Sequence, residues 1–279
     1  MRWLAVMIAL AGCGPHPAAA VDAEIADVPP VADAPAGLPR TIVTLNLRCL
    51  IDEWDARLPI IADGLIATGA DVIGLQEVCA LTGGRDALEE LVAALHSRGW
   101  DDLVAVRTTT HRAWDMYEEG LAVMSRHPIE ATRVAVLPMG ALPRKVLVAR
   151  VAVPDGHLVF ATTHLDHQSA TTRAAQATEA ARAVSTFAAA GEQIVLVGDL
   201  NDEPGGGVTT ALRAAGLVDA WAAVHPGDAG PTFPASGPTI RIDYVWLDGA
   251  TPMAIERILQ TPVSGVHASD HVGLRVQVR

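Results

Sequence analysis

Basic and aromatic residues are both scarce in this chain of 279 residues. Lys and Arg number 20 against 32 Asp and Glu, which gives a formal net charge of -12, and aromatic residues make up 4% of the sequence. A protein that holds nucleic acid along an extended surface neutralises phosphates with many Lys and Arg side chains. The composition therefore predicts no extended nucleic-acid footprint. It also leaves little material for an aromatic hairpin that inserts into a membrane.

The start of the chain contains only a short run of apolar residues. Residues 1–12 hold an apolar run too short to span a bilayer, so they are interpreted as a secretion signal. The tetrapeptide ending at Cys13 resembles the lipobox of bacterial lipoproteins, which implies an exported protein held at a bacterial membrane by a lipid on Cys13. An ordinary signal peptide cut after a nearby Ala is the alternative, and it also predicts export. Residues 13–39 are interpreted as a disordered tether rich in Ala and Pro, followed by one folded domain at 40–279.

Only two cysteines, Cys49 and Cys79, follow the tether. In an exported chain such a pair favours a disulfide over a zinc site, because zinc needs more thiolates or histidines at closer spacing. The sequence predicts a strand at 41–47, a helix at 54–69 and a strand at 71–78, a crossover unit in which the two strands are parallel. Both cysteines then leave the same sheet edge, so a Cys49–Cys79 bridge is predicted.

Periodicity along the remainder predicts an α/β protein with two packed sheets flanked by helices. The polar segment 107–119 is interpreted as a loop. Helices are predicted at 86–98, 171–190 and 208–215, and strands at 100–106, 121–125, 131–137, 145–153, 157–165, 194–197, 241–247, 253–259 and 272–278. Antiparallel strands therefore follow the parallel unit.

Polar residues collect at the ends of these strands. In the stretch from Gln193 to Pro204, a buried strand leads through Gly198 into Asp199 and Asn201, which project to the same side. Taken alone, this is equally well an Asp-Asn turn of the kind that ends many strands. Charged residues in such places are costly unless they are paired or bind an ion. Comparable positions are Asn46, Glu77, His164, Asp166, Asp243, Asp270 and His271.

These residues carry a resemblance to a known family. The segments LN, GLQEV, THLDH, GDLND, RIDYVW and SDH occur in this order between Thr41 and Val278. In that order they resemble the endonuclease/exonuclease/phosphatase superfamily, which includes deoxyribonuclease I. The resemblance implies a deoxyribonuclease I-like fold, a four-layer α/β/β/α sandwich of two mixed sheets. It also implies a metal-dependent phosphoesterase site at one edge of the sheets.

Oxygen ligands dominate the set and favour a hard divalent cation, Mg²⁺ first, with Mn²⁺ or Ca²⁺ as alternatives. Glu77 is the best candidate metal ligand, and Asn46 and Asp270 complete or orient its shell. Hydrolysis of a phosphoester needs an oriented water and compensation of the charge that develops on the phosphoryl group. We expect Asp199 to position or deprotonate the water and Asn201 to donate its amide to a phosphate oxygen.

Two histidines complete the predicted site. Asp243 is expected to hold His271 in one tautomer, which makes His271 a proton carrier or a phosphate ligand. His164 is expected to place a second imidazole near the phosphate or the leaving group. His167 is interpreted as part of a helix cap. Six further histidines are interpreted as ordinary surface or core residues: His96, His111, His127, His157, His225 and His267.

Further contacts with a substrate are left open by the sequence. Asp166 either joins the site or caps the helix that begins near Ser169, and Arg144 is either a phosphate contact or a surface residue. The segment from Tyr117 to Gly120 is a candidate for lining the cleft. The predicted protein is a monomeric, exported phosphoesterase, and a non-catalytic surface module on the same fold is the alternative. Nuclease, sphingomyelinase or phospholipase C-like, and inositol-phosphate phosphatase activities all stay open.

Overall fold

The computed structural model describes residues 38–279. The predicted signal segment at 1–12, Cys13 and residues 13–37 of the predicted tether lie outside the described residues. None of the described helices is long and apolar enough to cross a membrane.

The chain forms two six-stranded mixed sheets. The first has the strand order β11-β12-β1-β2-β4-β3. Its elements and the two helices that accompany it are β1 (Arg40–Asn46), α1 (Trp54–Thr68), β2 (Val72–Leu81), α2 (Ala87–His96), β3 (Val104–Ala113), β4 (Tyr117–Ser125), β11 (Pro252–Ile258) and β12 (Gly273–Val278). The predicted crossover unit is confirmed, because β1 and β2 are parallel neighbours joined by α1.

The second sheet has the order β5-β6-β7-β8-β10-β9. Its elements and helices are β5 (Ile129–Val136), β6 (Lys145–Val153), β7 (Gly156–His164), α3 (Ala170–Ser185), β8 (Gln193–Asp199), α4 (Gly207–Ala214), β9 (Val218–Asp219), α5 (Ala220–Val224) and β10 (Asp243–Asp248). Strands β7 and β8 are also parallel and joined by a helix. Each sheet thus contains one parallel pair among antiparallel strands.

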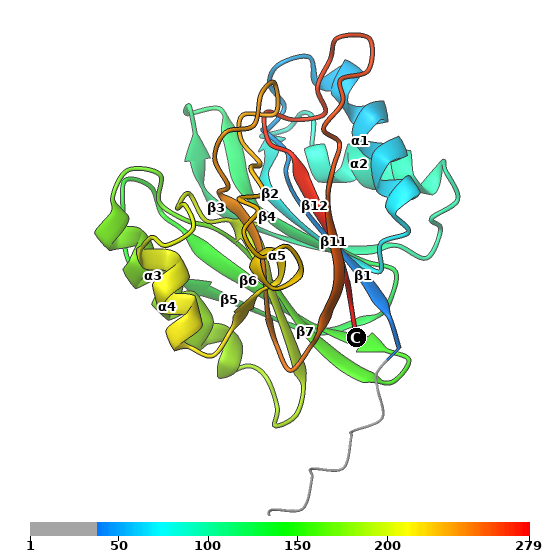
Figure 1. The fold of residues 1–279 in the computed structure, drawn as a ribbon. Helices are drawn as coiled ribbons and strands as arrows, with labels where there is room; N and C mark the ends of the chain where they lie inside the picture. The colour runs from blue at the N-terminus through cyan, green and yellow to red at the C-terminus, as the bar shows by residue number, and fades with distance from the viewer. Residues whose placement is uncertain (1–37) are drawn as a thin grey trace, which may run out of the picture. The chain divides into compact units, whose positions relative to one another are not determined.

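The two sheets and the helices outside them form four layers (Figure 1). Three hydrophobic cores lie between these layers. The core between α1, α2 and the first sheet includes Ile61 and Leu91, and the core between the sheets includes Phe160. The third lies between the second sheet and the helices α3 and α4, where Ala180 and Leu212 are buried. This arrangement confirms the predicted four-layer sandwich.

One prediction about the chain is wrong. Residues 107–119, expected to be a loop, form most of a hairpin in which β3 and β4 pair from Val104 with Ser125 to Ala113 with Tyr117. β3 is an edge strand whose side chains are mostly half-buried or exposed, so polar residues occupy it and the apolar alternation that identifies a strand is missing. The correction turns Glu119 from a loop residue into a strand residue with a fixed direction.

Candidate functional site

The C-terminal ends of the strands in the two parallel pairs, β1–β2 and β7–β8, lie in one region. Asn46 ends β1 and Glu77 lies on the neighbouring strand β2, while His164 ends β7 directly beside Asp199 at the end of β8. Asp243 pairs opposite Asp199 across the antiparallel neighbour β10. His164, Asp199 and Asp243 therefore form a row across three strands, and cross-strand neighbours project to the same face. Glu77, His164 and Asp199 line a cavity of about 630 Å³.

Two backbone features let the strand ends meet. Gly198 has φ +150°, and a Cβ at this position would lie 2.0 Å from the carbonyl oxygen of Thr163 on β7. Only glycine permits this close approach of β8 to β7. Glu77 has a left-handed φ of 49°, and it lies where the β2–β4 register shifts between Leu75 and Val78. Such a bulge redirects a side chain, here the Glu77 carboxylate toward Asn46 and the cavity.

Asn46 joins the two sheets. Its amide nitrogen donates to Glu77 Oε1 at 3.0 Å and to Asp199 Oδ2 at 3.1 Å, and its amide oxygen accepts from the backbone N–H of Arg48 at 2.9 Å. Burial raises the pKa of Glu77, whereas the hydrogen bond from Asn46 lowers it in part. Asn46 thus fixes one acidic residue from each sheet relative to the other.

The Asp199 carboxylate lies at the centre of the cluster. Its Oδ2 is 3.5 Å from Nε2 of His164 and 3.6 Å from Nε2 of His271, and its Oδ1 accepts the backbone N–H of Asn201 at 3.0 Å. Burial raises the pKa of Asp199, against the opposing charge of His271. Burial and the charge of Arg144 lower the pKa of His164, so that imidazole is neutral at pH 7.

His271 is held by Asp243. Nδ1 of His271 lies 2.9 Å from Asp243 Oδ2 and 3.2 Å from Oδ1, and both residues are buried. Phe233 packs against the imidazole with ring centroids 4.8 Å apart. Burial opposes the charged imidazole, but Asp243 and Asp199 outweigh it and raise the pKa of His271 to about 10. The cavity therefore contains a protonated imidazole next to a carboxylate.

The other predicted residues take different positions. Asn201 lines the cavity with φ 51°, and its amide nitrogen donates to the carbonyl of Leu165 at 3.2 Å. Asp270 also lines the cavity and is paired with Arg48 at 3.3 Å. The carboxylate of Asp166 accepts backbone N–H bonds from three residues that precede α3, 141, 168 and 169, so it fixes the loop before the helix, and the N-cap of α3 is Ser169. Tyr117 packs its ring against Trp114 with centroids 6.1 Å apart.

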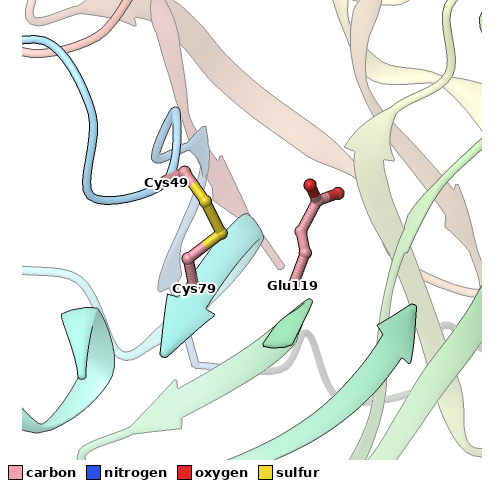
Figure 2. A group of neighbouring side chains, drawn as sticks. All are labelled: Cys49, Cys79 and Glu119. Carbon is pink, nitrogen blue, oxygen red and sulfur yellow. A yellow bond between two sulfur atoms is a disulfide. The ribbon is translucent and has the colours of Figure 1, made fainter. Parts of the chain in front are cut away.

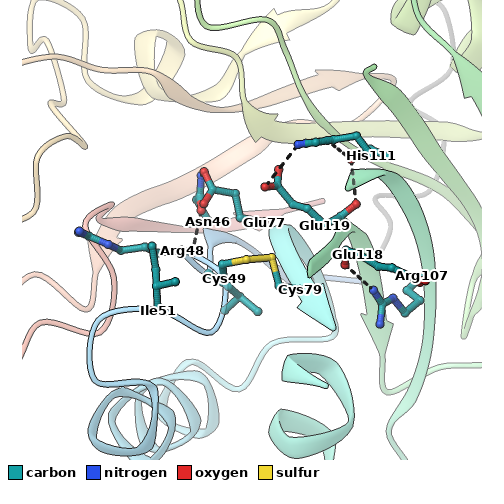
Figure 3. Close-up of a disulfide and its surroundings, with 12 residues drawn as sticks. Asn46, Arg48, Cys49, Ile51, Glu77, Cys79, Arg107, His111, Glu118 and Glu119 are labelled. Carbon is teal, nitrogen blue, oxygen red and sulfur yellow. Dashed lines mark hydrogen bonds and ion pairs between the residues drawn. A yellow bond between two sulfur atoms is a disulfide. The ribbon is translucent and has the colours of Figure 1, made fainter. Parts of the chain in front are cut away.

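The predicted disulfide is present between Cys49 and Cys79 (Figure 2). Both cysteines are fully buried, and the backbone N–H of Cys49 donates to the carbonyl of Glu77 at 3.1 Å. Glu119 lies close to the two sulfur atoms, but bonded sulfurs are not thiolate ligands and the three residues do not form a metal site. Figure 3 shows that the bridge ties together the segments that carry Asn46 and Glu77.

Arg144, Glu119 and His111 also line the cavity. Arg144 was a candidate, and Glu119 falls within the candidate stretch 117–120, but sequence reasoning missed His111. In β4 the exposed Glu118 and the buried Glu119 alternate, and His111 pairs opposite Glu119 on β3. Recognising the hairpin would have found both residues.

The residues present fit a divalent cation. Single ligand atoms of Glu77, His164 and Asp199 lie within 4.8 Å of one another, and Asp270 is close enough for its charge to raise the pKa of Glu77. Buried carboxylates with raised pKa values repel one another unless a cation compensates them. Oxygen-rich groups of this kind suit a hard cation better than a thiophilic one.

Known proteins share this architecture. A family model described as the endonuclease/exonuclease/phosphatase family matches residues 43–271. A solved family protein from Leptotrichia buccalis is similar, with a TM-score of 0.74 at 19% identity over 86% of this chain and 99% of that chain. A family structure from Beutenbergia cavernae has a TM-score of 0.69 at 28% identity, covering 86% of this chain and 71% of that one. A mannosyl-6-phosphatase from Bacteroides thetaiotaomicron has a TM-score of 0.69 at 18% identity, covering 86% and 99%. No curated protein matches the chain.

Proposed function

The chain belongs to the endonuclease/exonuclease/phosphatase family, and from that premise we propose that it is a Mg²⁺-dependent hydrolase of phosphoester bonds. The observation that carries the proposal is the pair of hydrogen bonds from Asn46 to Glu77 and Asp199, which unites acidic residues of both sheets beside the Asp243–His271 pair. A non-catalytic module has no need for a buried cluster of carboxylates whose ionisation burial disfavours. Such a cluster is typical of sites that bind a cation and move protons.

Glu77 is the residue that would hold the cation, with Asn46 orienting it and Asp270 and Asp199 adjacent. When bound, a divalent cation supplies positive charge to the phosphoryl oxygens and lowers the pKa of a coordinated water. The backbone geometry at Glu77 and the Cys49–Cys79 bridge restrict the movement of this carboxylate. The protein therefore contributes a rigid anionic receptor for the cation.

Proton movement falls to Asp199 and His271. The raised pKa of Asp199 makes its carboxylate a stronger base than an exposed one, so it orients an attacking water and accepts its proton. His271, protonated and held by Asp243, donates a hydrogen bond from Nε2 to a phosphoryl oxygen or to the leaving oxygen. His164 is neutral and contacts Asp199, so it orients that carboxylate without adding charge.

The substrate class can be separated by a direct screen. We expect the full chain with Mg²⁺ to hydrolyse p-nitrophenyl phosphate or bis-p-nitrophenyl phosphate, and EDTA to stop the reaction. Plasmid DNA, RNA, sphingomyelin and inositol phosphates tested in parallel identify the natural class. Nicking of plasmid DNA would contradict the argument from the net charge of -12. Inactivity towards every ester with Mg²⁺, Mn²⁺ and Ca²⁺ would refute the proposal.

We also propose that the enzyme is exported and anchored through a lipid on Cys13. Two observations support this: the segment that ends at Cys13, and the buried disulfide, which is characteristic of proteins outside the reducing cytosol. Expression with radiolabelled palmitate should label the wild-type protein but not a Cys13→Ser variant. Equal labelling of both proteins, or of neither, would refute the anchor.

A further inference from the structure

A buried arginine of α1 contacts two loops that lead into the site. Arg57 is 3% exposed, and its guanidinium donates to the backbone carbonyl of Ala268 at 2.9 Å. It also donates, over distances of 2.7–3.2 Å, to the carbonyls of five residues in the loop after β1: Leu47, Arg48, Cys49, Ile51 and Asp52. A guanidinium has five N–H groups, so at least one of them is shared between carbonyls. Arg57 therefore joins the loop that follows Asn46 to the loop that precedes Asp270.

The loop after β1 has an unfavourable backbone path. Arg48, Cys49 and Asp52 have left-handed φ values of 55°, 52° and 51°. Residues with a Cβ seldom adopt this conformation, and it persists only where the surrounding structure holds it in place. The donors of a guanidinium point in fixed directions in one plane, so the carbonyls that accept from it must keep matching directions. Arg57 is thus suited to hold this loop in its observed path.

The path of the two loops determines how Asn46 and Asp270 lie relative to each other. The backbone N–H of Arg48 donates to Oδ1 of Asn46 at 2.9 Å, and the guanidinium of Arg48 pairs with Asp270 at 3.3 Å. From the other loop, the hydroxyl of Ser269 donates to the backbone carbonyl of Asn46 at 2.6 Å. Both contacts come from residues at or next to a carbonyl that Arg57 holds. Arg57 therefore stabilises the geometry of the candidate cation site from outside it.

The charge of Arg57 belongs to the same arrangement. Burial lowers the pKa of Arg57 to about 10, and the charges of Asp270 and Glu77 oppose this effect, so the guanidinium stays protonated at pH 7. A buried cation is costly unless its hydrogen-bonding groups are used, and here backbone carbonyls use them. Because Arg57 directs its donors at carbonyls, the carboxylate of Glu77 stays available to a metal ion.

We propose that Arg57 is a positioning residue of the site. It holds the loop after Asn46 and the loop before Asp270 in one fixed arrangement, and this arrangement sets the affinity of the site for a divalent cation. The inference rests on the proposed function, because the cation site is part of that function. Arg57 acts through the residues that it holds and contacts neither the cation nor the substrate.

Cation binding by the full chain, measured without a substrate, tests the proposal. Titration with Mn²⁺, followed by electron paramagnetic resonance, gives the dissociation constant of the site that Glu77→Gln removes. Arg57→Lys keeps the charge, but its donors sit on one nitrogen and cannot reach both loops. Loss of a group that orients metal ligands typically weakens metal binding about 10- to 100-fold. We therefore expect Arg57→Lys to raise the dissociation constant for Mn²⁺ at least about tenfold.

Arg40→Met is the matched control, because Arg40 is also buried and lies at the opposite end of β1 from Asn46. It should lower the temperature of unfolding but change the dissociation constant for Mn²⁺ by less than about twofold. Circular dichroism checks that each variant is folded at the temperature of the titration. A folded Arg57→Lys variant that binds Mn²⁺ as tightly as the wild type overturns the proposal. Equal weakening of Mn²⁺ binding by both variants also overturns it, because Arg57 would then contribute to stability alone.

Hydrogen exchange of the protein in EDTA tests the geometry separately from the proposed function. The backbone N–H groups of Cys49 and His271 are hydrogen-bonded, one in each of the two loops. Both should exchange faster in Arg57→Lys than in the wild type, and Arg40→Met should leave both rates unchanged. If the wild type binds no Mn²⁺, the proposed cation site fails, but faster exchange in both loops still supports Arg57 as the residue that joins them. Unchanged exchange in either loop overturns the inference.

Discussion

Asp243→Asn separates the charge of the Asp243–His271 pair from its geometry. Asp243 is 2% exposed and His271 is 5% exposed, and their nearest atoms are 2.9 Å apart. Asparagine keeps the shape but removes the anion that stabilises the imidazolium. Removing one partner of a buried ion pair costs about 3–5 kcal/mol. We therefore expect unfolding in urea with EDTA at pH 6 to show a loss of this size.

The pH dependence follows from the raised pKa of His271. Stability from a raised histidine pKa is fully present below the ordinary value of 6.5 and is lost as pH rises through about 10. The difference in unfolding free energy between wild type and Asp243→Asn should therefore shrink between pH 6 and pH 10. Asp248→Asn, at the exposed end of the same strand, should change stability by less than about 0.5 kcal/mol.

The same variant should be a poor enzyme. Loss of one preorganised hydrogen-bond donor to the developing charge costs about 10²- to 10³-fold in rate, so kcat/KM at pH 7 should decrease by a factor in that range. A stability difference that stays constant from pH 6 to pH 10 would refute the charge argument. Full activity in a folded Asp243→Asn protein would refute the role of His271.

Three other residue changes test the frame around the site. Arg57→Met should lower the free energy of unfolding by about 3–5 kcal/mol, because the buried guanidinium of Arg57 donates to six backbone carbonyls. An unchanged free energy of unfolding in urea would contradict this. Replacing both Cys49 and Cys79 with Ser opens a link across 30 residues and should cost about 3–4 kcal/mol in thermal or urea unfolding, whereas an unchanged midpoint would contradict it. Glu77→Gln should raise the Mg²⁺ concentration for half-maximal rate at least about tenfold, and an unchanged Mg²⁺ dependence would remove Glu77 from the cation site.

Much of the fold could be predicted from the sequence, because the patterns that identify its strands and helices lie within short segments. The strand–helix–strand unit from Arg40 to Leu81 shows a clear change of period, and the helix ends at Gly69 in a left-handed conformation, as its sequence predicts. The β3–β4 hairpin was not accessible, because the edge strand β3 carries Thr, His and Arg where alternating apolar residues were expected. Strand β9 and helix α5 have two and five residues and are too short for periodicity to detect.

The candidate site divides in the same way. The predicted crossover unit placed Asn46 and Glu77 at the same end of the sheet. That Asp199 and Asp243 join them at one edge was implied by the family resemblance. Which groups these residues contact depends on how the two sheets pack against each other, and the sequence does not show this. The bridging position of Asn46, the orientation of Glu77 at a bulge and the contacts of Arg57 with two loops all arise from tertiary packing.

The central claim is that the residues around Asp199 hydrolyse a phosphoester with the help of a bound cation. The most direct test measures kcat/KM for bis-p-nitrophenyl phosphate with Mg²⁺, before and after EDTA, for the wild type, Asp199→Ala and His271→Ala. We predict activity in the wild type that EDTA removes and Mg²⁺ restores, and a loss of at least about 10²-fold in each folded variant. Wild-type activity that survives EDTA, or a folded variant with wild-type activity, would contradict the account.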